Sequence, residues 1–142
     1  MKAREYGLYL LNKRAYTRKE LENKLFKKGF QCEEVTEVLN EFMELKWIND
    51  YVYAETYILN QIEYGFKSKM QIQYKLMEKG IDKDHIMALM EQYYTREKEE
   101  KNIKYLIEKY SRTGSLPREK LIARLGRKGF SISFVVSVLD EE

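Results

Sequence analysis

Apolar residues recur along this chain in a pattern that repeats about every fifty positions. The sequence Lys-Gly followed by an apolar residue occurs three times, with its glycines at Gly29, Gly80 and Gly129. When the segments are aligned on these glycines, leucine or isoleucine falls eight and four residues before each of them. Aliphatic residues or methionine fall six, nine and ten residues after each of them. This register predicts three internal repeats.

The positions after each glycine predict an amphipathic helix. In the first repeat Val35, Val38, Leu39 and Phe42 follow the i, i+3, i+4, i+7 spacing, which places them on one face of a helix. The second repeat has the same spacing. We therefore expect a third helix in each repeat.

A second helix is expected to run up to each glycine, because glycine readily adopts the left-handed conformation that ends a helix. Its start is predicted at Thr17, Ser68 and Pro117, twelve residues before the glycines. Thr17 with Glu20, and Ser68 with Gln71, have the spacing of a capping box. Pro117 suits a first turn, where no amide hydrogen is required.

A first helix is expected to precede each of these pairs. Its apolar positions lie at Tyr6 to Leu11, Tyr51 to Ile62, and Ile103 to Tyr110. Linkers between repeats are expected near Lys46 to Asp50 and near Thr95 to Lys98.

The predicted fold class is therefore all-α, with three tandem three-helix repeats. They are predicted to occupy residues 1–46, 47–97 and 98–142. Stacked units of this size bury a continuous core, which predicts an elongated, curved right- or left-handed stack.

The composition agrees with helices and with a cytoplasmic protein. One proline and seven glycines leave little turn chemistry for a sandwich or barrel. Cys32 is the only cysteine, so neither a disulfide framework nor a cysteine-based metal site is expected. No apolar run approaches the roughly 20 residues of a membrane span, and the first five residues do not resemble a signal peptide.

Charge is distributed more regularly than the net value of +3 suggests. Basic residues gather in and just before each second helix. These candidate partner-binding or DNA-binding residues are Lys13, Arg14, Arg18, Lys19, Lys24, Lys27, Lys28, Lys67, Lys69, Lys75, Lys79, Arg112, Arg118, Lys120, Arg124, Arg127 and Lys128. The third helices are expected to be acidic, through Glu33, Glu34, Glu37, Glu41 and Glu44 in the first repeat and Asp140, Glu141 and Glu142 in the last.

Two interpretations of this charge pattern are open. The second helices could form a broken basic ridge that fits a phosphate backbone or an acidic protein groove. Alternatively, opposite charges on neighbouring helices face one another on a solvated surface, where such pairs contribute little.

Residues that would indicate an enzyme are missing from the sequence. His85 has no cysteine or histidine at metal-ligand spacing. The chain has no phosphate-binding loop, no GxGxxG and no GxSxG motif. We predict no catalytic residues, no metal and no cofactor.

The order and spacing of several segments resemble the RecX family of RecA-recombinase regulators. The stretch from Thr17 to Leu21 is similar to that family's S/T-R-x-E-L segment, and Lys28-Gly29-Phe30 to its KGF. Residues 48–57, with Ile48-Asn49-Asp50 followed by Tyr53, Ala54 and Tyr57, resemble its [IL]-[ND]-D-x-x-[FY]-A-x-x-[FY] stretch. Ile72, Leu76 and Lys79-Gly80-Ile81 match its R-I-x-x-E-L-x-x-K-G-[IV] segment.

The sequence departs from the family pattern at three of these positions. The family's usual glycine before the [IL]-[ND]-D stretch corresponds to Lys46, its usual arginine before Ile72 to Gln71, and its usual glutamate before Leu76 to Lys75. The third repeat matches the pattern least well.

The resemblance implies a monomeric protein that lies in the groove of RecA–DNA filaments and modulates, by inhibition, filament growth, recombination and the SOS response to DNA damage. Single- or double-stranded DNA is a further possible partner. Two alternatives remain: a helical, helix-turn-helix-type DNA-binding protein without a recombinase partner, and a protein-interaction scaffold of repeat type.

Overall fold

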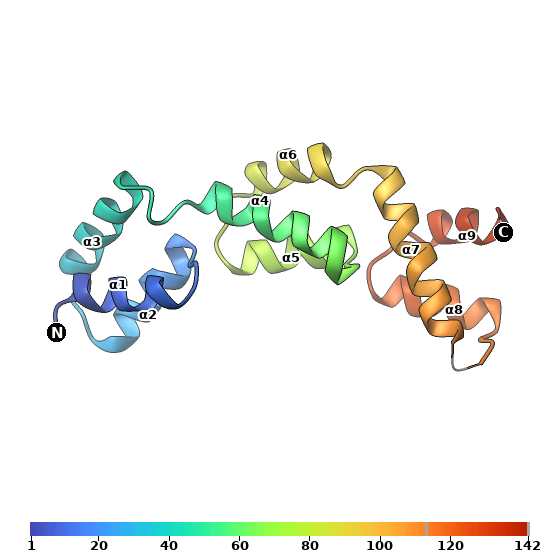
Figure 1. Cartoon of the computed structure of the whole chain (residues 1–142), viewed down its shortest axis with the longest axis horizontal. Coiled ribbons are helices and arrows are strands. Elements are labelled where there is room, and N and C mark those ends of the chain that lie inside the picture. Colours follow the sequence, from blue (N-terminus) through green and yellow to red (C-terminus); the bar gives the residue numbers. More distant parts are fainter. Residues whose placement is uncertain (113, 142) are drawn as a thin grey trace.

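A computed structural model describes residues 1–112 and 114–141, and these residues form an all-helical chain (Figure 1). The described residues contain nine α-helices, one π-helical segment and no strands. The elements are α1 (Ala3–Lys13), α2 (Arg18–Lys28), α3 (Cys32–Glu44), α4 (Asp50–Asn60), the π-helix η1 (Gln61–Gly65), α5 (Lys69–Glu78), α6 (Lys83–Tyr93), α7 (Arg96–Ser111), α8 (Arg118–Arg127) and α9 (Ile132–Asp140). Glu142, one of the acids expected in the last repeat, lies outside the described residues.

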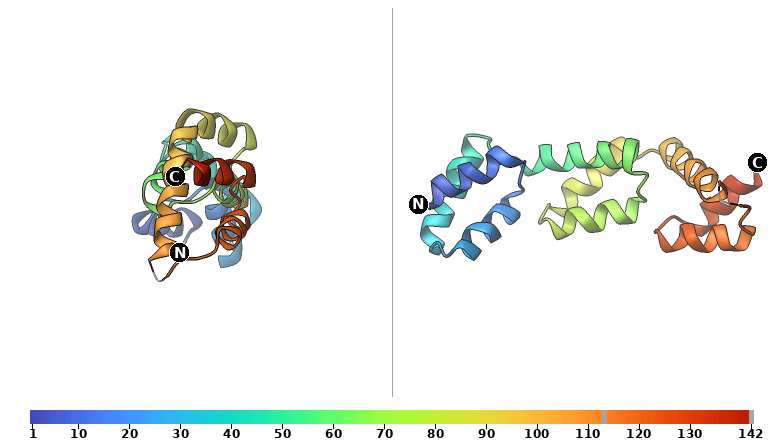
Figure 2. Two further views of the ribbon diagram at one scale, coloured as in Figure 1. Left: turned by 90° about the vertical axis from the view of Figure 1, so that its right-hand side faces the viewer. Right: turned by 60° about the horizontal axis from the view of Figure 1, so that its bottom comes forward.

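The helices gather in threes along one long axis, with the two ends of the chain at opposite ends of the body (Figure 1). The end-on view in Figure 2 shows how slim this body is. The predicted fold class, an elongated array of three-helix repeats, is confirmed. The predicted boundaries after residues 46 and 97 remain predictions.

Each group of three helices has its own apolar core. The three cores use the same register, because the aliphatic residues eight and four positions before each glycine and six positions after it are all buried. In the first group these residues are Leu21, Leu25 and Val35, each with no exposed surface. Ile48 also belongs to the first core. The repeat in the sequence is therefore a repeat of small, separate cores, and the prediction of one continuous core is wrong.

The ends of the second helices follow the expected chemistry. Thr17 and Ser68 each form a complete capping box, with Glu20 and Gln71 respectively. All three glycines after these helices have positive φ, at 108° for Gly29, 86° for Gly80 and 103° for Gly129. Pro117 is the residue before α8, at the N-cap instead of inside the first turn.

One predicted linker extends too far along the chain, because only its first residue, Thr95, lies between helices. The sequence placed it near Thr95 to Lys98, but α7 begins at Arg96. The Thr95 side chain accepts a hydrogen bond from the Lys98 N–H, and Glu97 and Glu99 lie in the first turn, where the helix dipole favours acidic residues. The charged stretch that suggested a linker is therefore the start of a helix. At the other linker Asn49 caps α4 as expected, through its hydrogen bond from the Val52 N–H.

Two residues other than glycine have positive φ among the described residues: Lys46, at 61°, and Phe66, at 52°. Lys46 lies where the RecX pattern usually has glycine. A side chain with a Cβ destabilises this backbone conformation by roughly 1–2 kcal/mol. Phe66 has a compensating contact, because its ring stacks on Tyr105 with ring centroids 3.8 Å apart.

We predict that Lys46→Gly raises the free energy of unfolding by about 0.5–1 kcal/mol, because glycine relieves the strain without the loss of a buried contact. Phe66→Gly is the matched comparison, since it relieves the same strain but removes the ring stack, and it should lower the free energy of unfolding. Urea denaturation followed by circular dichroism measures both. A destabilised Lys46→Gly variant would contradict this account of the turn.

Candidate partner-binding surface

The three second helices follow one another end to end along one edge of the molecule, the lower edge of the right-hand view in Figure 2. The hydroxyl of Thr17, at the start of α2, donates a hydrogen bond of 2.7 Å to the carbonyl of Lys79, at the end of α5. The hydroxyl of Ser68, at the start of α5, donates one of 2.6 Å to the carbonyl of Lys128, at the end of α8. Both hydroxyl residues are fully buried. We call this row of α8, α5 and α2 the column.

Each junction of the column places the carbonyl end of one helix against the amide end of another. The last carbonyls and first amides of a helix lack partners within the helix, and their partial charges have opposite signs. The glycines permit the close approach. A Cβ on Gly129 would lie 2.8 Å from the Ser68 hydroxyl oxygen, and a Cβ on Gly80 would lie 2.6 Å from the Lys19 side chain.

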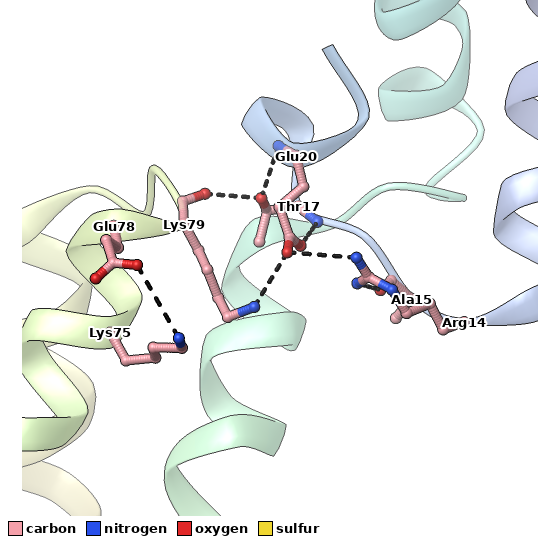
Figure 3. Close-up of polar contacts among 7 residues, drawn as sticks. All are labelled: Arg14, Ala15, Thr17, Glu20, Lys75, Glu78 and Lys79. Atoms are coloured by element: carbon pink, nitrogen blue, oxygen red, sulfur yellow. Dashed lines mark hydrogen bonds and ion pairs between the residues drawn. The ribbon is translucent and has the colours of Figure 1, made fainter. Parts of the chain in front are cut away.

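The first junction, between α5 and α2, is charged (Figure 3). The Lys79 ammonium lies 3.0 Å from the Glu20 carboxylate, and the Arg14 guanidinium lies 3.6 Å from it. The Thr17 N–H donates to the same carboxylate at 3.0 Å. Burial raises the pKa of Glu20, but the Thr17 N–H and the Lys79 ammonium outweigh burial and hold this pKa below its ordinary value.

At the second junction, between α8 and α5, neutral groups and rings take the place of the Glu20 cluster, and an exposed ion pair of Lys98 with Glu63, 2.8 Å apart, also joins the second and third groups of helices. Gln71 occupies the position of Glu20, and the stacked rings of Phe66 and Tyr105 join the second and third groups of helices. The Tyr94 hydroxyl donates to the Lys67 carbonyl at 2.6 Å and accepts from the buried Asn102 side chain at 3.2 Å. Burial raises the pKa of Tyr94 to about 12. The ion pair at the second junction is exposed, whereas that at the first is mostly buried, so charge contributes less to the second junction.

We predict that Glu20→Gln lowers stability at neutral pH and that this loss disappears in acid. A carboxyl group whose pKa is lowered by folding stabilises the fold above its ordinary pKa of 4.5, and this contribution is lost as the pH falls through the folded-state pKa. Glutamine keeps the capping geometry, as Gln71 does. The difference in free energy of unfolding between parent and variant, measured from pH 7 to pH 3, should shrink below about pH 4.5. If the difference in free energy of unfolding between parent and variant did not change with pH, it would contradict a charged Glu20 at the first junction.

Several of the predicted binding residues contact the chain itself. The cation at the first position of each second helix lies at the end of the third helix of its own repeat. Arg118 pairs with Asp140 at 2.6 Å, and the Lys69 ammonium lies 5.7 Å from the centre of the Tyr94 ring. The Arg18 Nε lies 3.1 Å from the Met43 sulfur. Cations are favoured at helix C-termini, which gives these three residues a structural role.

Other predicted cations cover tyrosine rings. The guanidinium groups of Arg14 and Arg124 lie 3.6 and 3.7 Å from the ring centres of Tyr16 and Tyr110. The further ring contacts are Lys13 over Tyr9, Lys28 over Tyr6 and Lys79 over Tyr53. These contacts hold the positive charges close to the helix surface, where cation–π attraction is favourable.

The remaining candidates differ in how freely their charges face solvent. Arg112 and Lys75 lie within 4.0 Å of Glu108 and Glu78. Lys128 is half-buried at the second junction. The exposed candidates for which the structure describes neither an acidic partner nor a ring contact are Lys19, Lys24, Lys27, Lys67, Lys120 and Arg127. Five of these six lie on α2 or α8, the helices at the two ends of the column. The exposed positive charge of the column is therefore concentrated at its ends.

The acidic third helices are less regular than expected. Within the described residues α9 has one acid, Asp140, and that carboxylate pairs with Arg118. In α3, Glu33 and Glu37 are exposed, whereas Glu41 pairs with Arg4 of α1 at 2.8 Å. Pairs of opposite charge between helices therefore account for part of the pattern.

The junction hydroxyls were recognised in the sequence only as helix starts. Their second role, as donors to the following repeat, was missed. A signal was present: Thr17 and Ser68 lie 62 and 60 residues before Lys79 and Lys128, so a similar hydroxyl-to-lysine spacing occurs twice. The sequence alone does not show that these residues meet.

The two other residues singled out in the sequence lie on the surface. Cys32 is exposed at the start of α3, and His85 is exposed on α6 with its ring 5.7 Å from that of Tyr51. Across the described residues, every helix is too short or too polar to span a lipid bilayer.

Comparison with known families identifies two parts of the chain. Residues 3–42 match the model of the first three-helix domain of RecX, and residues 49–90 match that of its second three-helix domain. These segments contain all of α1, α2, α4 and α5 and most of α3 and α6.

The chain is similar to curated regulatory proteins named RecX. It is 29% identical over 138 residues to that of Caldanaerobacter subterraneus subsp. tengcongensis, covering 97% of this chain and 69% of the relative. It is 30% identical over 146 residues to that of Oceanobacillus iheyensis, covering 98% and 54%. It is 34% identical over 140 residues to that of Streptococcus pneumoniae strain Hungary19A-6, covering 95% and 53%. The chain thus spans about half the length of the last two relatives.

Solved structures show the same arrangement of helices. The crystal structure of RecX from Lactobacillus salivarius superposes with a TM-score of 0.82 at 27% identity, over 98% of this chain and 93% of that one. A second crystal structure, of regulatory protein RecX, has a TM-score of 0.86 at 26% identity, over 97% and 71%. Family models, relatives and structures agree, and the chain belongs to the RecX family of regulatory proteins.

Proposed function

We propose that the chain binds RecA–DNA filaments in the filament groove and limits their growth, and thereby restrains recombination and the SOS response. The observation that carries this proposal is the column, which aligns three basic second helices along one edge of an elongated body. Membership of a family of regulatory proteins supports it.

The column is suited to a partner that presents the same binding surface repeatedly, as a filament does. Its exposed cations lie mainly at the two ends, on α2 and α8, so a bound chain would contact two places on a filament. Several weak contacts on one rigid body act together, because the first contact raises the effective concentration of the second. Binding that favours one filament state is sufficient for regulation, and no chemical step is needed.

The alternative partner is DNA without a recombinase. Exposed lysine and arginine also bind phosphate directly, and each contact with single-stranded DNA would add about −0.7 to the slope of log affinity against log salt. A protein that acts in this way would bind bare DNA as tightly as it binds a filament.

We predict that Lys24→Glu with Lys27→Glu, and Lys120→Glu with Arg127→Glu, each weaken filament binding by about tenfold or more, and that all four together weaken it further. These side chains are exposed, so the fold should be retained. The measurements are sedimentation with RecA filaments on single-stranded DNA at several salt concentrations, and RecA ATPase with the protein titrated in.

The matched control changes exposed charge on another helix. Glu33→Gln with Glu37→Gln on α3 should leave filament binding equal or stronger if the partner surface is phosphate. Unchanged binding of the fourfold variant at every salt concentration would refute the proposed surface. Equal affinity of the parent for bare DNA and for filaments would favour the alternative.

A further inference from the structure

A hollow lies between the first and second groups of helices, where the charged junction leaves space. Its volume is about 360 Å³. It is lined by Ala15, Tyr16, Lys46, Trp47, Asn49, Val52, Tyr53, Thr56, Tyr57 and Asn60. Trp47 is the chain's only tryptophan, and 46% of its surface is exposed. We call this space the Trp47 hollow.

At the second junction, the corresponding space between two repeats is occupied by an aromatic side chain. Phe66, two residues before the cap Ser68, fills the space between repeats by stacking on Tyr105. The residue two positions before the equivalent cap Thr17 is Ala15, which lines the Trp47 hollow. The aromatic side chain of Phe66 thus fills the space at the second junction, whereas the methyl group of Ala15 leaves the space at the first junction open.

The apolar surface continues beyond the hollow. A neighbouring depression shares Ala15 and Trp47 with it and is also lined by Leu8, Leu11, Asn12 and Arg14. Val52, which lines the hollow itself, has half of its surface exposed. This surface can hold more than one apolar side chain of a partner.

The charges at the rim are positive. The charged residues that line the two depressions are Arg14 and Lys46, and neither lining contains an aspartate or a glutamate. An occupant with carboxylates beside its apolar side chains is therefore complementary in charge.

The rings of the hollow are poor platforms for nucleic-acid bases, because bases stack on open ring faces. The Arg14 guanidinium lies 3.6 Å from the centre of the Tyr16 ring, and the Lys79 ammonium lies 5.5 Å from that of Tyr53. The Arg4 guanidinium lies 5.9 Å from the centre of the Trp47 ring. A cation thus lies near three of the four aromatic rings that line the hollow, Tyr57 being the fourth, and leaves less open ring face for a base to stack on.

From these observations we infer that the Trp47 hollow is a protein-docking site, which receives an aromatic or large aliphatic side chain from an acidic segment of a partner protein. The partner's side chain lies in the Trp47 hollow at the first junction, just as Phe66 lies between the repeats at the second junction. This contact is separate from the basic column and does not depend on the proposed binding to filaments.

The test uses Trp47 as a reporter. The probe is a synthetic tryptophan-free peptide with a Phe-Leu pair flanked by glutamates. Its titration into the intact protein should shift Trp47 emission to shorter wavelength and reach saturation, because the indole becomes shielded from water. Val52→Lys should weaken the response about tenfold. Ala15→Phe should shift the emission of the free protein and abolish the response, because the chain then fills its own hollow.

Three controls decide the outcome. Met87→Lys places the same charge at an exposed apolar residue of α6 and should bind the peptide like the parent. A peptide with lysines in place of glutamates, and one with alanines in place of Phe-Leu, should bind weakly. No saturable shift with the acidic peptide, or an equal shift with the basic one, would overturn the inference. Stronger quenching of Trp47 by oligo-dT than by the peptide would assign the hollow to nucleic acid instead.

Discussion

A buried hydroxyl at the start of one helix, hydrogen-bonded to the last carbonyl of a helix in the next repeat, is the interaction on which the shape of this molecule depends. It occurs twice, from Thr17 to Lys79 and from Ser68 to Lys128. Because each group of three helices has its own core, the junctions must supply the alignment that a shared core would otherwise give. The same hydroxyls cap their own helices, so one side chain both starts a helix and joins two repeats.

The two junctions use this interaction in different surroundings. The first adds the ion pair of Glu20 with Lys79, and the second adds stacked rings and the buried Tyr94–Asn102 hydrogen bond. Charge therefore lies inside the first junction, and at the second it lies at the surface, in the exposed ion pair of Lys98 with Glu63. Cations that look equivalent in the sequence also differ in the structure, because some are held against rings or carboxylates and others are open to a partner.

The sequence predicted the helices and their ends well, because apolar spacing, capping boxes and glycines are local signals. It failed at Arg96 to Lys98, where high charge suggested a linker but favours the first turn of α7. It could not predict the column, because Thr17 and Lys79 meet only when two repeats pack. It also could not separate Lys24, which is exposed, from Lys79, which is held at a junction, since both are lysines of the same predicted ridge.

The most direct test of the column is the distance between its ends. Spin labels on cysteines at positions 24 and 127, in a Cys32→Ser background, report the separation of α2 and α8 by double electron–electron resonance. The parent should give one narrow distance distribution. Thr17→Val with Ser68→Ala, which removes both junction hydroxyls, should broaden it while the helix content measured by circular dichroism changes little. An equally narrow distribution in that variant would contradict the claim that these hydroxyls align the repeats.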